Sequence, residues 1–417
     1  MGIRELYNLY IENFLVDTDT RKIRPETIFF ALKGDNFNGN EFAEQALHKG
    51  ARYCVIDEAE YSQVENTILV KDVLKTLQEL ANYHRKQLSI PILALTGSNG
   101  KTTTKELINS VLSTQYITTA TLGNLNNHIG VPLTLLSITD KTEIGIVEMG
   151  ANHLKEIEFL SEIAEPDLGY ITNFGKAHLE GFGGIEGVIK GKSELYNYLR
   201  SNGKMVFVNP NDKKQVELTE NHERTLLNNT LKIVSTHPYL KINYKSTIIH
   251  THLVGEYNFS NIQAATSIGE YFKINESNIV KALENYIPSN NRSQIIENGT
   301  NTIILDAYNA NPSSTELALK NFSQIDSSSK IAILGDMFEL GEEAETEHQY
   351  MVDFSNSLNI NQVIFVGSNY YKTNAVEKFT DFEALKESIS KTTFKDSSIL
   401  IKGSRGMALE RLLDFIN

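Results

Sequence analysis

The chain has 417 residues, of which 41% are hydrophobic and 22% charged, with a formal net charge of -13. This composition is typical of a globular protein, the length predicts about three domains, and the negative charge argues against a general nucleic-acid surface. No stretch approaches the roughly 20 apolar residues of a membrane span and no signal-peptide core is present, so we expect a cytoplasmic protein.

Residues 1–88 are predicted to form a small α/β module. The strand-like segments TIFFALKG and ARYCVIDE flank the helix-like segment NEFAEQALHKG, which gives a β-α-β pattern. Cys54 is predicted to be a buried apolar strand residue. Two polar loops, one containing Thr20 and Arg21 and the other reading GDNFNGN, suit a small polar ligand, although a capped loop and a surface turn also explain them.

The stretch at 91–105, PILALTGSNGKTTTK, predicts a phosphate-binding turn between a short buried strand and a helix. The helical apolar spacing is evident from Lys105 onward. Gly97 and Gly100 let the backbone approach an anion at a helix N-terminus. Lys101 would reach the outer phosphates, and Thr102 would hold Mg²⁺. Because the first glycine of the general motif is missing, an ordinary strand-to-helix connection is the alternative.

Residues 89–286 are predicted to be a central ATP-binding domain with a parallel sheet. Apolar runs within 143–152, 167–174 and 204–210 each end in polar residues, as strands do where they open onto a ligand crevice. The polar segment 213–250 has weak strand signals and no detailed assignment. Residues 255–272 are predicted to be helical.

Four separated positions of this domain are candidates for one metal–nucleotide site: Thr102, Glu148, His178 and Lys192. Hard cations prefer oxygen ligands, and an imidazole can complete a second Mg²⁺ shell. Taken singly, a solvated strand-end acid, a surface histidine and an exposed helix lysine are the alternatives. The loop GNLNNHIGVP, which contains Asn127, is a candidate for facing the γ-phosphate and an acyl substrate, or else a plain connection.

Residues 287–417 are predicted to form a Rossmann-like C-terminal domain after a linker at Pro288 and SNNRSQ. Strands and helices alternate, which gives a parallel sheet with helices on both faces. The predicted strands are TIILDA, KIAILG, QVIFVG and SILIKG, and the predicted helices are SSTELALKNF, EEAETEHQYMVDF, FEALKESI and GMALERLLDFI.

Polar signatures directly follow three of these strands, as at a ligand-facing sheet edge: LDAYNANPSS, LGDMFELG and IKGSRG. Asp306 is a candidate for binding a ribose hydroxyl. Lys402, Ser404 and Arg405 could clamp a carboxylate, since arginine offers a bidentate fork. For Arg405 alone, a surface cation at a helix start is the alternative.

Several of these motifs, in this order, resemble those of the Mur ligase family of ATP-dependent amide-bond-forming enzymes, and the resemblance covers nearly the whole chain. The motifs are TGSNGKTTTKE, GNLNNHIGVPLT, EMGANHLKEI, ITNFGKAHLEGFGG, GKSELY, GEYNFSNIQAA, NRSQ, DAYNANP, LGDMFELGEEA and KGSRGM. The resemblance implies an α/β fold in which the module 1–88 binds a uridine nucleotide.

The combination of YNANP with LGDMFELG resembles the dipeptide-adding member of the family. It implies that the substrates are UDP-N-acetylmuramoyl-tripeptide and D-alanyl-D-alanine, joined through an acyl phosphate in peptidoglycan precursor synthesis. The implied cofactors are ATP and Mg²⁺, and the implied state is a monomer without nucleic-acid partners.

The resemblance also implies roles for individual residues. Lys101, His178 and Lys192 would be catalytic, and Lys192 would be carbamylated by CO₂ to join Thr102, Glu148 and His178 as a metal ligand. ATP would contact Gly97, Ser98, Asn99, Gly100, Lys101, Thr102, Thr103, Asn258, Asn261, Arg292 and Asp306. Substrates would contact Thr20, Arg21, Asn127, Asn309, Asn311, Lys402, Ser404 and Arg405.

One departure from the family pattern concerns the ribose contact. The family often has two acids before YNANP, whereas Leu305 precedes Asp306 here. Two other functions remain as alternatives: a related ligase with another acceptor, such as a folylpolyglutamate-type enzyme, and a phosphate-loop binding or switch protein. The C-terminal strand-end signatures argue against the switch protein.

Overall fold

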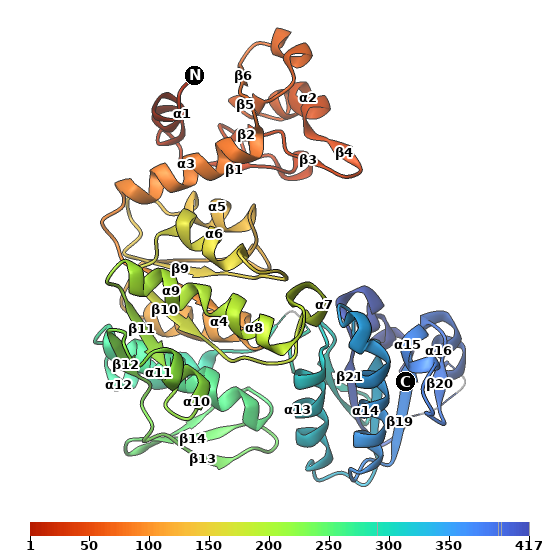
Figure 1. Ribbon diagram of the computed structural model, residues 1–417. Helices are drawn as coiled ribbons and strands as arrows, with labels where there is room; N and C mark the ends of the chain where they lie inside the picture. The colour runs from red at the N-terminus through yellow and green to blue at the C-terminus, as the bar shows by residue number, and fades with distance from the viewer. Residues whose placement is uncertain (290, 391, 393, 417) are drawn as a thin grey trace.

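The structure is a computed structural model that describes residues 1–417 except 290, 391, 393 and 417. Three main sheets follow one another along the chain, from the red-orange N-terminal part through the yellow-green centre to the blue C-terminal part (Figure 1). This is the three-part α/β architecture expected from the sequence, while the boundaries after residues 88 and 286 stay predictions. Within the described part of the chain, no helix is long and apolar enough to cross a membrane.

The N-terminal sheet has four parallel strands in the order β1-β2-β5-β6. Helix α2 (Ala43–His48) connects β2 to β5, which confirms the predicted β-α-β unit. Cys54 is buried, as predicted. The GDNFNGN turn is a hairpin of two short strands. The strands are β1 (Val16–Asp17), β2 (Ile28–Phe30), β3 (Lys33–Gly34), β4 (Phe37–Asn38), β5 (Tyr53–Ile56) and β6 (Thr67–Leu69).

A long helix that was not predicted, α3 (Val73–Gln87), joins the N-terminal and central sheets (Figure 1). Asp72 caps it by accepting a hydrogen bond from a first-turn amide at 2.8 Å. The helix packs against α1 (Ile3–Tyr10), α5 (Gly130–Leu135) and α6 (Glu156–Ala164), and it therefore ties the N-terminal part to the central part.

The central sheet has six parallel strands in the order β12-β11-β10-β7-β9-β8. Every residue of β7 is buried, because strands flank it on both sides. The phosphate-loop turn therefore leaves the sheet near its middle. The strands are β7 (Ile92–Thr96), β8 (Thr118–Ala120), β9 (Ile144–Glu148), β10 (Leu168–Ile171), β11 (Met205–Val208) and β12 (Arg224–Leu226).

Helices cover this sheet, and the first, α4 (Lys101–Leu112), begins four residues before Lys105. It can begin there because Gly100, with φ of 78°, ends the turn in the left-handed region that glycine favours. The other helices are α7 (Leu179–Phe182), α8 (Ile185–Lys192), α9 (Glu194–Ser201), α10 (Lys213–Leu218), α11 (Phe259–Tyr271) and α12 (Glu276–Asn285).

The segment that had no detailed assignment contains a small antiparallel sheet of β13 (Lys232–Ser235), β14 (Lys241–Tyr244) and β15 (Thr247–His250). Ile242 and Tyr244 alternate with partly exposed polar residues along β14, so one face of this sheet packs on the core. Only this short alternation marks strands in a polar stretch.

The C-terminal sheet has the order β16-β17-β21-β18-β19-β20. Its inner strands are parallel, as predicted, but the edge strand β16 (Gln294–Asn298) is antiparallel to β17. The predicted linker SNNRSQ therefore already enters the sheet at Gln294. The other strands are β17 (Asn301–Asp306), β18 (Lys330–Gly335), β19 (Gln362–Val366), β20 (Lys378–Phe379) and β21 (Ser398–Lys402).

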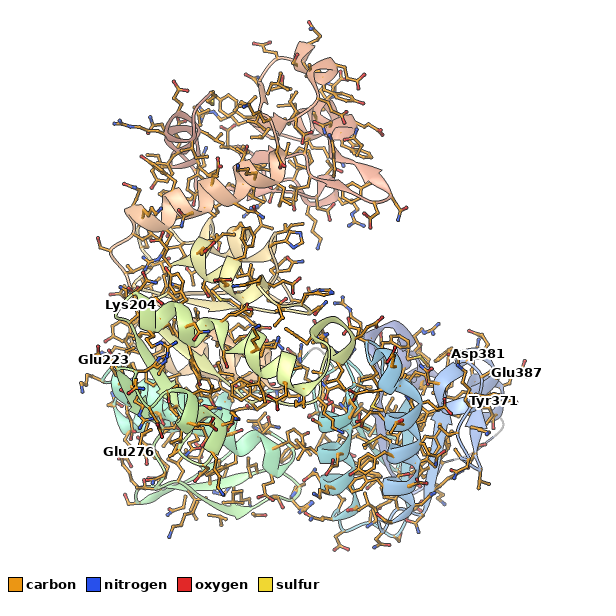
Figure 2. All side chains as sticks on the ribbon, in the orientation of Figure 1. Lys204, Glu223, Glu276, Tyr371, Asp381 and Glu387 are labelled. Atoms are coloured by element: carbon orange, nitrogen blue, oxygen red, sulfur yellow. The ribbon has the colours of Figure 1, made fainter. Side chains whose placement is uncertain are left out.

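The helical segment predicted at GMALERLLDFI is helical, but of the 3₁₀ type. It forms two 3₁₀ segments, Arg405–Met407 and Leu409–Asp414, because Ala408 has φ of 48° and interrupts the helical backbone. The α-helices of this domain are α13 (Pro312–Ser323), α14 (Ala344–Asn356), α15 (Ser368–Tyr371) and α16 (Phe382–Ile389). Figure 2 labels Tyr371 at the edge of this domain that faces away from the central domain.

Candidate active site

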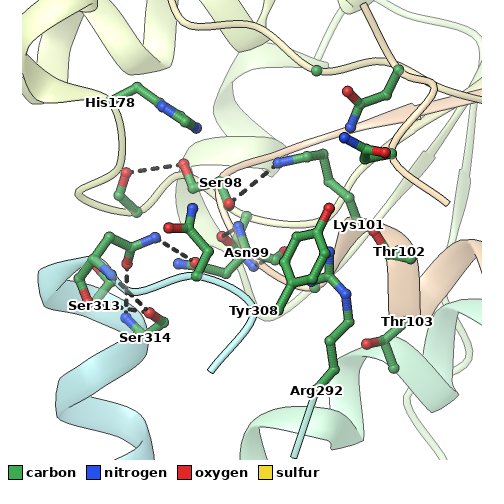
Figure 3. Close-up of a pocket in the computed structure, with 18 of the residues that line it drawn as sticks. Ser98, Asn99, Lys101, Thr102, Thr103, His178, Arg292, Tyr308, Ser313 and Ser314 are labelled. Atoms are coloured by element: carbon green, nitrogen blue, oxygen red, sulfur yellow. Dashed lines mark hydrogen bonds between the residues drawn. The ribbon is translucent and has the colours of Figure 1, made fainter. Parts of the chain in front are cut away.

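A cavity of about 1000 Å³ lies where the carboxyl ends of the central strands meet the C-terminal domain. Most of the predicted site residues line it, from segments far apart in the sequence, and Figure 3 shows several of them. The lining residues that were predicted are Ser98, Asn99, Gly100, Lys101, Thr102, Thr103, Asn127, Glu148, His178, Asn258, Asn261, Arg292, Asp306, Asn309, Asn311, Lys402, Ser404 and Arg405.

Two glycines shape the phosphate loop on one wall of this cavity. At Gly97, with φ of 143°, an added Cβ would lie 2.0 Å from Thr172 Oγ1. At Gly100, the Cβ would lie 2.7 Å from Asn261 Oδ1. Larger residues at either position would push the loop away from its neighbours. This short loop therefore needs both Gly97 and Gly100, although it lacks the first glycine of the general phosphate-loop motif.

Lys101 extends into the loop, where its Nζ donates hydrogen bonds to the carbonyl oxygens of Gly97 at 2.7 Å and Ser98 at 3.3 Å. Burial lowers the pKa of Lys101; nearby Glu148 opposes this shift and Arg292 adds to it. An anion bound here would favour the charged ammonium, because it would offset both the desolvation and the neighbouring guanidinium. The loop is thus suited to phosphate.

Glu148 at the end of β9 is the strongest candidate for a metal ligand. Its Oε1 accepts hydrogen bonds from Thr102 Oγ1 at 3.2 Å and from Asn126 Nδ2 at 2.8 Å. Its Oε2 is buried and has no hydrogen-bond partner among the described residues. A buried carboxylate oxygen without a partner is costly, and a Mg²⁺ ion beside Thr102 would satisfy it. The donor set therefore fits the predicted ion.

His178 and Lys192 are placed differently from this pair. Nδ1 of His178 lies against a carboxylate oxygen of Glu339 of the C-terminal domain, and this contact lowers the pKa of Glu339 despite its partial burial. Lys192 does not line the cavity; its Nζ is fully buried and donates to the carbonyl of Ala151, a lining residue, at 2.9 Å. Burial holds the pKa of Lys192 well below its usual range, and Lys101 lowers it further.

Two of the predicted ATP contacts, Asn258 before α11 and Asn261 within it, form a hydrogen-bonded chain. Nδ2 of Asn261 donates to Oδ1 of Asn258 at 2.8 Å, and Thr104 Oγ1 donates to Oδ1 of Asn261 at 2.9 Å. Asn258 donates in turn to the carbonyl of Val254 at 2.7 Å. Their buried amides therefore link α4 to α11 at the edge of the cavity.

The three residues of the predicted carboxylate clamp line the cavity but differ in their contacts within the protein. Nζ of Lys402 is buried and paired with Asp306 Oδ2 at 2.6 Å, so these two residues, predicted to bind different ligands, bind each other. Oγ of Ser404 is also used within the protein, because it accepts a hydrogen bond from the Phe338 amide at 2.9 Å. Arg405 is exposed. The sequence shows residue types at strand ends but not these pairings.

The C-terminal domain touches the phosphate loop through YNANP. Nδ2 of Asn311 donates to Oδ1 of Asn99 at 2.8 Å. Just beyond these two segments, the Lys176 amide donates to Ser313 Oγ at 2.9 Å. Asn311 also caps α13 through its Oδ1. The neighbouring Asn309 is exposed, and its Oδ1 accepts from the next amide at 2.9 Å.

Of the remaining predicted substrate contacts, Asn127 lines the cavity. The side chain of Asn127 caps the start of α5, and it is the adjacent Asn126, which was not singled out, that binds Glu148. Consecutive asparagines in an irregular loop give no periodicity from which to choose between them. Thr20 and Arg21 do not line this cavity; they lie in the N-terminal part, where exposed Arg21 pairs with Asp19 at 2.8 Å.

Three family models match the chain. They are described as "Mur ligase family, catalytic domain" at residues 15–89, "Mur ligase middle domain" at 95–269 and "Mur ligase, glutamate ligase domain" at 291–405. Curated relatives named UDP-N-acetylmuramoyl-tripeptide--D-alanyl-D-alanine ligase include those of Bacillus subtilis, 33% identical over 95% of this chain and 92% of its own, and of Escherichia coli, 32% identical over 95% and 92%.

A solved structure, titled "Crystal structure I of MurF from Acinetobacter baumannii", superposes with a TM-score of 0.83. It is 28% identical in sequence and matches over 96% of this chain and 92% of its own. The likeness thus extends over all three sheets and both sides of the cavity.

Proposed function

The chain belongs to the Mur ligase family, and we propose that it uses ATP to join D-alanyl-D-alanine to UDP-N-acetylmuramoyl-tripeptide. The observation that carries this proposal is the shared cavity, in which the phosphate loop at Lys101 meets Arg292, Asp306 and Arg405 of the C-terminal domain. Nucleotide and acyl substrate can meet there. A cytoplasmic, monomeric enzyme remains our prediction.

The reaction has two chemical steps. A carboxylate oxygen of the tripeptide attacks the γ-phosphorus of ATP, the bond to ADP breaks, and an acyl phosphate forms. The amine of D-alanyl-D-alanine then attacks the acyl carbon through a tetrahedral intermediate, phosphate leaves, and the nitrogen loses a proton as the amide forms. Lys101 and Arg292 hold the phosphates during the first step. The contacts of Asn311 and Ser313 bring the C-terminal domain over the site and limit access of water to the acyl phosphate.

Thr102 and Glu148 would hold Mg²⁺, with His178 as ligand of a second ion once its pairing with Glu339 is exchanged for the metal. The ion would supply positive charge where the transferred phosphoryl group carries negative charge. The orphaned Oε2 of Glu148 supports this assignment.

Carbamylation of Lys192 is supported by its surroundings. A lysine attacks CO₂ only as the neutral amine, and burial shifts Lys192 toward that form. The nitrogen of a carbamate keeps one hydrogen, so the bond to the carbonyl of Ala151 can persist. The product would place a carboxylate beside Ala151 on the cavity wall.

The uridine nucleotide would bind the N-terminal part, where Thr20 and Arg21 are the candidate contacts.

Phosphate release from ATP tests this function. With Mg²⁺ and UDP-N-acetylmuramoyl-tripeptide present, we expect D-alanyl-D-alanine to stimulate release strongly, and mass spectrometry to find the tripeptide extended by the dipeptide. Glutamate and L-alanyl-L-alanine serve as control acceptors. Equal release with and without the dipeptide would contradict the proposal, and a product with glutamate would favour a folylpolyglutamate-type acceptor.

A further inference from the structure

Tyr308, which was not among the predicted site residues, lies against Arg292 in the cavity. The Cζ atom of Arg292 is 3.7 Å from the centroid of the Tyr308 ring. Figure 3 shows the ring and the guanidinium together next to Lys101. On the same ring, Cζ of Arg405 lies 5.5 Å from the centroid. One aromatic side chain thus contacts two cations that face the cavity.

The Tyr308 ring lies in close contact with the guanidinium of Arg292. The Nε atom of Arg292 is buried and has no hydrogen-bond partner among the described residues. Among the residues that the structure describes, no Asp or Glu carboxylate forms an ion pair with Arg292. An arginine side chain has several rotatable bonds, so without the ring its head group would sample many positions.

The backbone around Arg292 is held on both sides. Asn291 and Ser293 have φ of 56° and 49°, in the left-handed region that residues other than glycine seldom adopt. The carbonyl of Asn291 accepts from the Tyr308 amide at 3.2 Å, and Oγ of Ser293 is hydrogen-bonded to Tyr257 of the central domain at 2.7 Å. The backbone aims the side chain toward the cavity, and the ring determines where its end lies.

The position is electrostatically unfavourable without an anion. Arg292 lies close enough to Lys101 to lower its pKa, and Arg405 approaches the same ring. Like charges repel, whereas the π-face of Tyr308 attracts a cation and can keep the guanidinium near the phosphate loop. This arrangement suits a polyphosphate, which would lie between these cations.

We propose that Tyr308 is a positioning residue for ATP: its ring holds the guanidinium of Arg292 where it meets the nucleotide's phosphates beside Lys101. This inference rests on the proposed function, because it takes ATP to be the ligand. It separates Tyr308 from the groups that react, since the ring acts through Arg292. The role depends on the aromatic face and not on the hydroxyl.

The test is the affinity for ATP of Tyr308→Leu, measured by calorimetry on the full chain. We expect the Kd for ATP and the KM for ATP to rise about five- to 20-fold, the size of a buried cation–π contact, with the KM for the dipeptide nearly unchanged. Tyr308→Phe should restore both values. Tyr371→Leu is the matched control, because Tyr371 lies under Lys378 at 5.5 Å in the same domain but outside the cavity.

A double-mutant cycle with Arg292→Met identifies the route of the effect. If Tyr308 acts through Arg292, Tyr308→Leu should add little in the Arg292→Met background, and binding of AMP, which lacks the outer phosphates, should change little. Additive losses with equal weakening of AMP would mean that the ring stacks on adenine and would overturn the inference. Unchanged ATP affinity in Tyr308→Leu would also overturn it.

Two further controls keep the outcome readable. Thermal melting of each variant reports folding, and Tyr308→Met is a second variant, since its flexible side chain fills irregular space. A wild-type chain that binds no ATP would contradict the proposed function itself. A wild-type chain that forms product, beside a Tyr308→Leu variant of equal ATP affinity, would contradict only the role of Tyr308.

Discussion

Asn311 of the C-terminal domain donates a hydrogen bond to Asn99 of the phosphate loop at 2.8 Å, and its other amide atom caps helix α13. One side chain therefore joins the two halves of the cavity and stabilises a helix start. These two roles can be separated by mutation.

Asn311→Ala should lose both roles, and Asn311→Asp should keep the cap but place a carboxylate oxygen against Oδ1 of Asn99. We expect the first variant to lower the free energy of unfolding by about 1 kcal/mol and the second to leave it near the wild-type value. Both should lower kcat about three- to tenfold, the size of one hydrogen bond. Urea unfolding and steady-state kinetics measure the two effects. Wild-type kcat in Asn311→Asp would mean that the contact with Asn99 has no role in the reaction.

The buried ion pair of Lys402 and Asp306 predicts a large loss of stability when one partner is removed. Lys402→Met leaves the Asp306 carboxylate without its cation, and we expect the free energy of unfolding to fall by about 3 kcal/mol. Adding Asp306→Asn should recover much of this loss, because the uncompensated charge is gone. Urea unfolding of the single and double variants checks this, and additive losses would show that the two side chains do not depend on each other.

His348 predicts a decrease in stability at acid pH. Its ring is fully buried; Nε2 accepts a hydrogen bond from the Met337 amide at 3.0 Å, and burial lowers its pKa below that of an exposed histidine. Below about pH 6.5 the unfolded chain takes up a proton that the folded ring resists. Stability is therefore full above that pH and falls as the pH decreases below it.

We expect His348→Asn to remove part of this slope, which for one proton is at most about 1.4 kcal/mol per pH unit. Unfolding free energies between pH 7.5 and 5.5 give the slope. His153→Asn is the control, because its side chain is 65% exposed. The account of His348 is wrong if its variant and the wild type have the same slope.

Lys192→Ala should reduce ligase activity by more than about 100-fold, since a metal ligand would be lost. Bicarbonate should not restore activity, whereas a short-chain carboxylic acid should restore part of it by placing a carboxylate in the vacated space. With ¹³C-labelled bicarbonate, NMR should find a carbamate signal in the wild type that Lys192→Ala lacks. Lys190→Ala, on the exposed side of the same helix, is the control. An identical signal in both variants would remove Lys192 from the site.

Local patterns predicted the elements whose signals lie within a few residues. The apolar run before Thr96 and the glycines at 97 and 100 are sufficient to place a strand, a turn and a helix. The pairing of Asn99 with Asn311 spans 212 positions, so it follows only from how the two domains meet. The stacking of Arg292 on Tyr308 likewise depends on left-handed backbone on either side of the arginine. The residue types at these positions do not predict that backbone.

The sequence does not show other pairings, because neighbouring structure decides them. Strand β16 continues a polar linker into the sheet, where pairing with β17 satisfies its backbone. Lys402, predicted to contact a substrate, lines the cavity and also pairs with Asp306 on the adjacent parallel strand. Residue type at a strand end therefore predicts that a site exists there, and the register of the strands decides which residues bind each other.

The central claim is that this cavity turns ATP and a carboxylate into an acyl phosphate that a dipeptide amine attacks. The most direct test uses UDP-N-acetylmuramoyl-tripeptide with ¹⁸O at both oxygens of the reacting carboxylate, followed by mass spectrometry of the released phosphate. The account predicts one ¹⁸O in each phosphate released together with amide product, because the oxygen that attacks ATP leaves with phosphorus. Phosphate released in the presence of D-alanyl-D-alanine but free of ¹⁸O would contradict it, since water would then have attacked ATP directly.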